Sequence, residues 1–299
     1  MALLAGGVTI ATLSRQPHAP AAPKGPEIRA DLERHVTSFT SAFGPHGGYR
    51  SPARDERRAV ADGVGLLLDG RREEAARRLS SVGYGMLTLT DRATGRRYAE
   101  IAESDGSGAG TGRGWGRVYI DLDSPPRWSV QVPHPVADHD TERLGVAVLR
   151  GAPGGVLVLA GAHRRAGRGD EADVAHRVDT VFHAVCGELV DRGMPGIQVH
   201  GFADDSAPAY DAIVSTGRGE DGREEARGLA RELRDGGLEV CRAWARRCPL
   251  EGRSNRQGRR AAAEEVPFLH LEFSRSVRDD EERRTRTAEA VAATAADWG

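Results

Sequence analysis

Apolar segments of strand length alternate with helical segments over the second half of this chain, and this alternation constrains its fold more than any other feature. Strands are predicted at residues 128–134, 154–163, 196–202, 210–217, 238–244 and 267–274, and helices at residues 141–151, 173–193, 223–237 and 279–298. Apolar strands separated by helices imply a mixed, largely parallel sheet that is covered on both faces. We therefore predict an α/β fold, a three-layer sandwich of the phosphorylase/hydrolase-like kind.

The first half of the chain follows other patterns. Residues 27–82 show apolar residues at helical spacing after Pro26, which suits a helix start, so they are predicted to form an N-terminal helical extension. Residues 84–91 and 96–103 alternate as a hairpin does. The predicted organisation is an apolar segment with a Pro/Ala linker (1–26), the helical extension (27–82) and a catalytic α/β domain (83–299).

A glycine-rich stretch at residues 104–114 precedes a predicted strand at residues 116–123. A phosphate cradle needs a helix N-terminus after its glycines. A hairpin loop is therefore the favoured interpretation.

The charge balance excludes one class of function. The 299 residues include 42 Lys+Arg and 44 Asp+Glu, which gives a formal net charge of −2. Proteins that coat nucleic acids carry a strong positive excess, so no nucleic-acid partner is predicted. No sequence feature indicates an oligomeric state.

The N-terminal segment leaves two locations open. Met1 to Ser14 is apolar and as long as the core of a secretory signal, but no basic residue precedes it. It is too short to span a bilayer, and no other segment is apolar enough for a stable membrane span. Cytoplasmic and secreted or cell-surface locations both stay open.

The cysteines indicate neither a zinc ribbon nor a disulfide framework. There are three, Cys186, Cys241 and Cys248, and no two of them have the CxxC spacing. We expect them to be small buried hydrophobic side chains.

Histidines follow three of the predicted strands. His134 ends the strand at 128–134, His163 ends the strand at 154–163, and His200 lies near the end of the strand at 196–202. Ligand sites in open α/β sheets form beyond the carboxyl ends of the strands. The three histidines are therefore expected at one edge of the sheet.

The segment from His134 to Glu142 holds the densest group of metal-ligand side chains. It contains two histidines and three carboxylates in nine residues, HPVADHDTE. Zinc prefers such ligands, and a catalytic zinc site has three protein ligands and one open position. We predict that His134, a carboxylate of this turn and His200 bind zinc. The alternative is a solvated turn in which Asp140 caps the helix that begins near Thr141.

Glu272 is the second candidate. It lies in the apolar strand PFLHLEFS, where alternation places it on the same face as His270. A carboxylate on a central strand is costly unless it is paired or lies near a metal. At a zinc site it can act as general base and then as general acid. The alternative is an ion pair of Glu272 with Arg275 or Arg278.

Arginines are the third component. Arg164 and Arg165 follow His163, several arginines lie in residues 253–259, and Arg275 follows the strand of Glu272. Arginine binds carboxylates in a bidentate manner. We expect His163, Arg164 and Arg275 to bind a small anionic or peptide substrate.

Six segments occur in an order that resembles a family. VPHPVADHDTE, LAGAHRRA with DVAHR, QVHGF, SNRQGR and HLEFSRSVR, within residues 128–280, resemble zinc-dependent amidohydrolases related to N-formylglutamate amidohydrolase and phage-type poly-γ-glutamate hydrolase. That group in turn resembles the zinc carboxypeptidases and aspartoacylases. The resemblance implies a hydrolase with one zinc ion per chain.

The resemblance also implies roles for individual residues. The first histidine of the poly-γ-glutamate hydrolases follows a proline, as His134 does, and the second opens an HG pair, as His200 does. The late LE-S-R strand matches Glu272 as general base. The family has Glu and one more residue in the turn, so the middle ligand is assigned first to Asp138, then to Glu142, then to His139.

These observations lead to one main hypothesis and two alternatives. The main hypothesis is a zinc-dependent hydrolase that cleaves an amide or peptide bond of an anionic substrate such as an acyl-glutamate, poly-γ-glutamate or a peptide. The alternatives are a zinc-dependent N-acetylmuramoyl-L-alanine amidase acting on peptidoglycan and a non-catalytic binding homologue.

Overall fold

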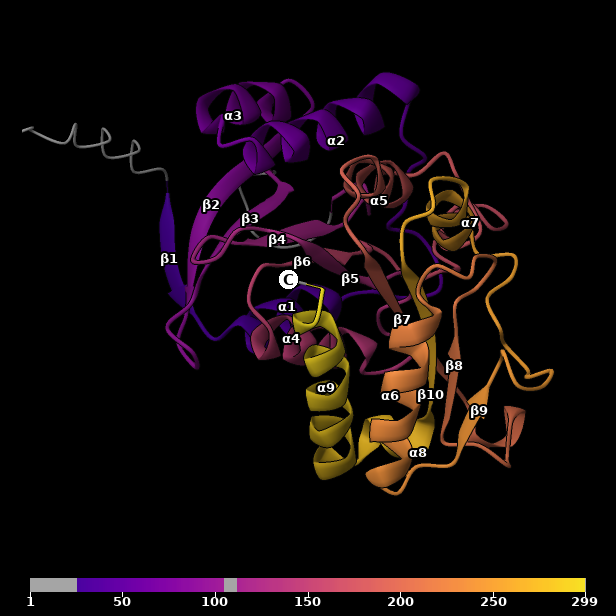
Figure 1. Cartoon of the computed structure of the whole chain (residues 1–299). Coiled ribbons are helices and arrows are strands. Elements are labelled where there is room, and N and C mark those ends of the chain that lie inside the picture. The colour runs from indigo at the N-terminus through magenta and orange to yellow at the C-terminus, as the bar shows by residue number, and fades with distance from the viewer. Residues whose placement is uncertain (1–25, 105–111, 299) are drawn as a thin grey trace, which may run out of the picture.

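One mixed sheet with helices on both faces forms the centre of the molecule (Figure 1). The computed structural model describes residues 26–104 and 112–298. Within them, the predicted three-layer α/β sandwich is confirmed. The expectations for the apolar N-terminal segment and for most of the glycine-rich stretch concern residues outside the described part.

Over the described residues, the sheet has ten strands in the order β1-β2-β3-β4-β6-β5-β7-β10-β8-β9. The strands are β1 (Glu27–Ala30), β2 (Tyr84–Asp91), β3 (Arg97–Glu103), β4 (Arg117–Asp121), β5 (Trp128–Val132), β6 (Gly155–Leu159), β7 (Gly196–Phe202), β8 (Ala212–Ser215), β9 (Val240–Arg242) and β10 (Phe268–Ser274). The four central strands β6, β5, β7 and β10 are mutually parallel. β2, β3 and β4 form antiparallel pairs, as the predicted hairpin requires.

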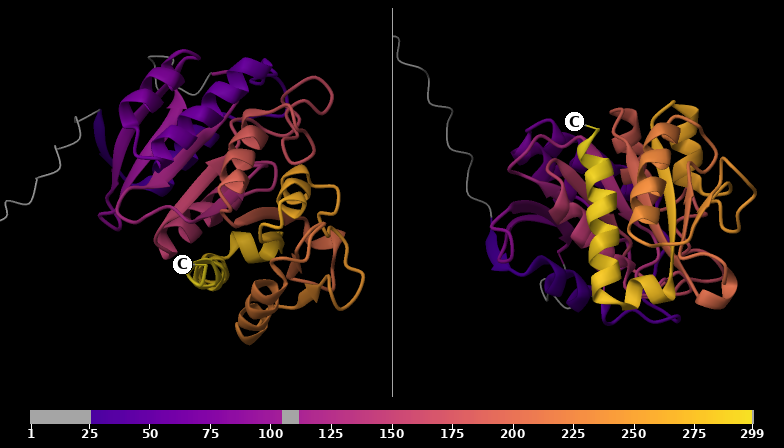
Figure 2. Two further views of the ribbon diagram at one scale, coloured as in Figure 1. Left: turned by 45° about the horizontal axis from the view of Figure 1, so that its top comes forward. Right: turned by 60° about the horizontal axis from the view of Figure 1, so that its bottom comes forward.

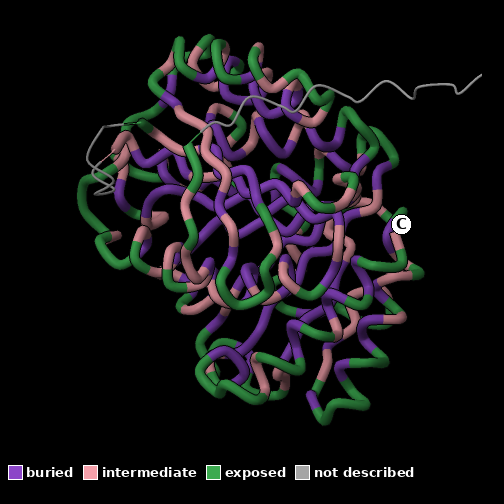
Figure 3. The backbone as a smooth tube through the Cα atoms, turned by 90° about the vertical axis from the view of Figure 1, so that its left-hand side faces the viewer, coloured by how far each residue is buried: buried purple, intermediate pink, exposed green. Residues whose placement is uncertain are grey.

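Helices cover the two faces in two groups (Figures 1 and 2). One face carries α1 (Leu32–Thr40), α4 (Thr141–Gly151), α6 (Arg223–Asp235), α8 (Arg275–Asp279) and α9 (Glu281–Ala296). The opposite face carries α2 (Arg54–Leu68), α3 (Arg72–Ser80), α5 (Val181–Asp191) and α7 (Arg256–Ala263). The buried residues concentrate between these layers and the sheet, and exposed residues lie on the outer helix surfaces (Figure 3).

The two faces of the central strands differ in polarity. Toward α4 and α9, β10 contributes Leu269, Leu271 and Phe273 to the large apolar core. On the other face, the same strand carries His270 and Glu272, both buried. This is the alternation predicted for PFLHLEFS, and it places a polar stripe inside the molecule.

β5 is the point at which the strand order reverses. The chain leaves β5 through α4 and returns as β6 on one side, and the next strand, β7, lies on the other side of β5. A crevice forms at such a point because the connections from neighbouring strands diverge. His134 follows β5 directly and therefore lies at this crevice.

The prediction of helix from residue 27 is wrong for the first four residues. Glu27–Ala30 form β1, which pairs in parallel with Thr88–Asp91 of β2. The helix begins only at Leu32, because the Asp31 side chain caps it by accepting from the Arg34 N–H. The buried Asp91 carboxylate also accepts from the Leu32 N–H at 3.0 Å.

The predicted helix at residues 173–193 begins eight residues late. Thr180 caps α5 by accepting from the His183 N–H at 3.0 Å. Residues 173–180 form turns instead, because Asp173 is bonded to three side chains that include His134 and Arg164. His176 consequently lies in a turn and not on the helix, whereas His183 is helical as predicted.

The expectation of unpaired cysteines is wrong for two of the three. Cys241 and Cys248 form a disulfide bond, whereas Cys186 is a free, buried thiol. The disulfide can form because the segment after β9 turns back toward the sheet. The Cα atoms of Cys241 and Cys248 therefore lie 6.0 Å apart.

No helix in residues 26–104 and 112–298 has both the length and the apolar character that crossing a bilayer requires.

Candidate active site

Polar side chains of three adjacent strands line up on the face toward α5 and α7. The register pairs Glu272 with His200, and His270 with Gln198, on β10 and β7. It also pairs Gln131 of β5 with Gln198. Because side chains alternate between the faces of a strand, these five point to the same side.

The turn after β5 brings a carboxylate back toward His134. The Asp138 N–H donates to the His134 carbonyl at 2.9 Å. Val136 and Asp140 have the left-handed backbone conformation, with φ of 65° and 61°. Asp140 stands at the N-cap of α4, yet its side chain makes no capping bond and pairs with Arg143 at 3.1 Å. The capping role in the alternative interpretation is therefore absent from this described turn.

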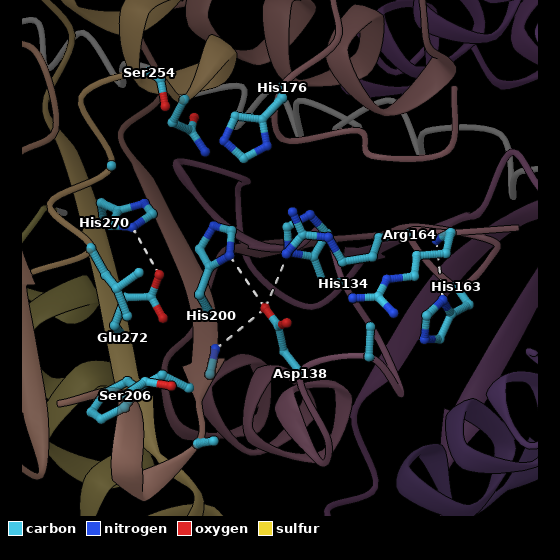
Figure 4. A pocket seen from close by; sticks show the side chains of 18 of the residues that line it. His134, Asp138, His163, Arg164, His176, His200, Ser206, Ser254, His270 and Glu272 are labelled. Atoms are coloured by element: carbon cyan, nitrogen blue, oxygen red, sulfur yellow. Dashed lines mark hydrogen bonds and ion pairs between the residues drawn. The ribbon is translucent and has the colours of Figure 1, made fainter. Parts of the chain in front are cut away.

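Three buried side chains converge at the crevice (Figure 4). Asp138 Oδ2 lies 3.1 Å from His134 Nδ1 and 3.4 Å from His200 Nδ1. Ligands in a tetrahedral zinc site lie about 3.3 Å apart when the bonds are about 2 Å long. His134, Asp138 and His200 are thus arranged as a group that can hold a metal ion.

The outer nitrogen of each histidine has an acceptor of its own. His134 Nε2 lies 2.8 Å from Asp173 Oδ1, and His200 Nε2 lies 2.7 Å from Gln198 Oε1. An acceptor at Nε2 holds the ring so that Nδ1 faces the metal position. Sequence reasoning missed Asp173 and Gln198, although the polar alternation in GIQVH is a signal for Gln198.

Burial and hydrogen bonding oppose each other in this group. Burial raises the pKa of Asp138, but hydrogen bonds with His134 and His200 outweigh it and hold that pKa well below its usual range. Burial and the neighbouring His270 lower the pKa of His200 to about 4. Burial lowers the pKa of His134, whereas hydrogen bonds to Asp138 and Asp173 raise it and prevail. The group therefore combines an ionised carboxylate with a neutral His200 at pH 7.

Glu272 lies on the other side of the crevice with its carboxylate largely free. Its Oε1 lies 3.3 Å from His270 Nε2. Within the described residues, neither predicted arginine pairs with it. Arg275 Nε bonds to Asp279 at 2.6 Å, and Arg278 donates only to backbone carbonyls.

Arg278 fixes the turn that carries Asp138. Its buried guanidinium donates to the carbonyls of Asp138 at 2.5 Å, Phe202 at 2.9 Å and Phe273 at 3.0 Å, and to that of His139. These carbonyls belong to the turn after β5 and to the ends of β7 and β10. One side chain thus joins the three segments that carry Asp138, His200 and Glu272.

A cavity of about 770 Å³ opens over these groups. Six of the predicted residues line it: His134, Asp138, His163, Arg164, His200 and Glu272. Other lining residues were not predicted for the site, among them His176, Ser206, Asn255 and His270. Figure 4 shows Glu272 and His270 on one side of the histidine–aspartate group and Arg164 with His163 on the other.

Three predicted site residues lie elsewhere. Glu142 is buried below the turn, where its Oε2 accepts from the Val136 N–H at 3.3 Å. His139 is exposed, and Arg275 is bonded to Asp279 on α8. None of the three lines the cavity. Asp138, the first choice for the middle ligand, is the carboxylate that lies between the two histidines.

The segment that follows the disulfide forms one wall of the cavity. Leu250, Gly252 and Ser254 follow Cys248 and line the cavity. Gly252 has φ of 68°, and a Cβ atom there would come within 2.4 Å of the His270 ring. Only glycine fits, because the backbone packs directly against that ring.

Comparisons with known proteins assign no family to this chain. No family model and no curated protein match its sequence. Several solved structures show weak likeness, and three of them illustrate it. The N-formylglutamate amidohydrolase of Ralstonia eutropha is 15% identical over 58% of this chain and 93% of that chain, with a TM-score of 0.41.

The other two structures are more distant in sequence. An aspartoacylase family protein of Mesorhizobium loti is 9% identical over 70% of this chain and 66% of that chain, with a TM-score of 0.38. The LapA aminopeptidase of Legionella pneumophila is 12% identical over 90% of this chain and 70% of that chain, also at 0.38. Likeness this weak decides nothing about activity, which rests on the geometry of the site.

Proposed function

We propose that this protein is a zinc-dependent hydrolase that cleaves an amide or peptide bond in an anionic substrate. One observation carries the proposal. A buried His134–Asp138–His200 donor group, with both histidines held through their outer nitrogens, shares a cavity with the glutamate Glu272, which has no arginine partner among the described residues.

The donor group suits zinc. Two imidazole nitrogens and one carboxylate oxygen are the ligands of many catalytic zinc sites, which leave a fourth position open. When bound, zinc supplies Lewis-acid chemistry, which polarises a carbonyl and acidifies water. The cavity in front of the group gives room for both the water and a substrate carbonyl.

Glu272 provides the proton transfers. It accepts a proton from the attacking water as the new C–O bond forms, and it donates that proton to the nitrogen as the C–N bond breaks. Its place across the cavity from Asp138 suits this role, since it faces the same space without being one of the three donors.

Cationic side chains on the opposite wall favour an anionic substrate. The cations are Arg164 and the exposed Arg165, which both line the cavity. His163 lies beside them, and burial and these two arginines lower its pKa. Arg164 is held by Asp173, with Nη2 2.5 Å from Oδ2, so its guanidinium has a fixed position. Acyl-glutamates, poly-γ-glutamate and peptides with a free carboxylate are the substrates to assay first.

Metal analysis combined with hydrolysis assays tests the proposal. The purified protein should hold about one zinc ion per chain, and His134→Ala and His200→Ala should each abolish stable binding. Glu272→Gln should keep the zinc and lower kcat about 10²- to 10⁴-fold.

Asp138→Asn and Glu142→Gln form a matched pair, because both are buried carboxylates of the same segment. The first should lose zinc and the second should keep it. A protein without zinc, or unchanged zinc content in the His134 and His200 variants, contradicts the proposal and favours a non-catalytic binding homologue. Cleavage of muropeptides in preference to acyl-glutamates would identify a peptidoglycan amidase.

A further inference from the structure

Four amide side chains form a buried hydrogen-bonded chain behind His200. Gln131, Gln198, Asn255 and Gln257 are each at most 2% exposed. They come from β5, β7 and the start of α7, and His200 contacts the chain through Gln198. Each amide has one donating and one accepting end, so the bonds of the chain have a direction.

Backbone groups fix that direction at the α7 end. Gln257 Nε2 lies 3.0 Å from the Val174 carbonyl, which only accepts, so this end of Gln257 must donate. Gln257 Oε1 then accepts from Gln198 Nε2 at 3.3 Å. Asn255 Oδ1 accepts from the Gly258 N–H at 2.9 Å, so Asn255 Nδ2 donates to Gln198 Oε1.

The β5 end has the same direction. Ser129 Oγ donates to the Pro195 carbonyl at 3.3 Å and accepts from Gln131 Nε2 at 3.2 Å. Gln131 Oε1 therefore accepts from Gln198 Nε2 at 3.1 Å. All three neighbours of Gln198 thus place its oxygen, and not its nitrogen, toward His200.

An oxygen at this position requires a proton on the histidine nitrogen that faces it. Gln198 Oε1 lies 2.7 Å from His200 Nε2. On the other side of the ring, Asp138 Oδ2 lies 3.4 Å from Nδ1 and would attract the same proton there. The amide chain and Asp138 therefore compete, and a proton on Nδ1 would block metal binding.

We propose that Gln198, held by Asn255, Gln257 and Gln131, is a positioning residue that keeps the proton of His200 on Nε2 and leaves Nδ1 free for a cation. The inference rests on the proposed function for its purpose, because Nδ1 is the atom that faces the proposed zinc position. It assigns the SNRQG segment a role through its amides. The arginines of that segment do not line the cavity.

Nitrogen NMR of the metal-free protein with ¹⁵N-labelled histidine tests the proposal, because the ¹⁵N shifts identify which ring nitrogen carries the proton. His200 should carry it on Nε2 in the unmodified chain. In Gln198→Met, which keeps the length of the side chain but removes the acceptor, the proton should move to Nδ1, toward Asp138. Zinc affinity, measured by competition with a chelator, should fall about 10- to 100-fold.

Gln131→Met is the comparison variant: it removes one of the three groups that hold Gln198 and leaves the Gln198 oxygen at His200 and the contacts with Asn255 and Gln257 in place. It should leave the proton on Nε2 and change zinc affinity less than about threefold. If Gln198→Met does not fold, the double variant Asn255→Ser/Gln257→Met releases Gln198 from the α7 side and should shift the proton in the same way.

A proton on Nδ1 in the unmodified protein, or one that stays on Nε2 in Gln198→Met, overturns the inference. The proton positions are measured without metal, so they are independent of the proposed function. If they are as expected but no variant binds zinc, the inference stands and the proposed function fails.

Discussion

His183 is partly buried on α5, where its Nδ1 lies 3.1 Å from Gln257 Nε2. Burial and, to a smaller extent, the nearby charges of Arg260 and Arg256 lower its pKa to about 4. In the unfolded chain the pKa returns to about 6.5. Between these values the unfolded state binds a proton that the folded state does not, so the free energy of unfolding falls as pH falls from about 6.5 to about 4.

Urea unfolding of the unmodified chain and of His183→Asn between pH 4 and pH 7 measures this contribution. Asparagine keeps an acceptor close to the position of Nδ1 and does not titrate. The unmodified protein should lose about 3 kcal/mol more than the variant across the window. Parallel stability curves would show that His183 titrates normally in the fold.

Arg278 has the largest structural effect that we expect of a single side chain at the site. In Arg278→Met, carbonyls of the turn after β5, of β7 and of β10 lose their shared donor. Buried carbonyls without partners cost about 1–3 kcal/mol each. We expect a loss of at least about 3 kcal/mol in the free energy of unfolding, together with weaker zinc binding.

Denaturant unfolding and zinc titration of the same variant test both effects. Arg278→Lys keeps the charge but cannot reach all of these carbonyls, and it should be intermediate. If Arg278→Met is destabilised but its zinc affinity is unchanged, the turn that carries Asp138 keeps its conformation without the Arg278 hydrogen bonds.

At the scale of elements, the disulfide joins edge strand β9 to the loop that lines the cavity. Closing a ring of this size, with a sequence separation of seven, contributes about 2.5 kcal/mol through the entropy of the unfolded chain. Cys241→Ser/Cys248→Ser should lower Tm, and KM should rise because Leu250 and Gly252 lose their tether. Thermal melts of the unmodified protein with and without a thiol reductant give the same comparison. A Tm that changes neither in the double variant nor with the reductant contradicts the expectation.

The sequence predicts the elements that follow from the periodicity of apolar residues, but not the contacts between residues that only the folded chain brings together. The strands of β5, β7 and β10 follow from apolar alternation, and the convergence of His134 and His200 follows from parallel strands ending at one edge. The Cys241–Cys248 bond is different, because nothing in the spacing shows that the chain turns back after β9.

Local competition explains the misplaced helix ends. The helical pattern extends back to residue 173, but Thr180 caps α5 and Asp173 is bonded to His134. The capping preference of threonine could have indicated that the helix begins after Thr180. The hydrogen bond between Asp173 and His134 can be seen only in the folded structure. Gln131, Gln198 and His270 alternate with apolar residues in their strands. This alternation is visible in the sequence and indicates the buried hydrogen-bonded amides next to His200.

At the scale of the whole molecule, the helices before β2 share an apolar layer with the later part of the chain. Val60 and Val64 of α2 pack in one cluster with Phe182 and Val185 of α5. The division at residue 83 stays a prediction, and a fragment of residues 83–299 tests whether that part is independent. We expect the fragment to be insoluble or to lack a cooperative melt, since it exposes this layer; a fragment that melts like the full chain would contradict this.

The strand order also determines when the site can form during synthesis. β10 lies between β7 and β8, yet it comes last in sequence among the strands of residues 26–104 and 112–298. His134, Asp138 and His200 are therefore synthesised well before Glu272 and Arg278, and until β10 is made one edge of β7 is unpaired, which favours wrong pairing. On the proposed function, a cation bound early by the three donors would hold the turn after β5 against β7 during that interval, and we then expect the yield of folded protein to depend on metal supply.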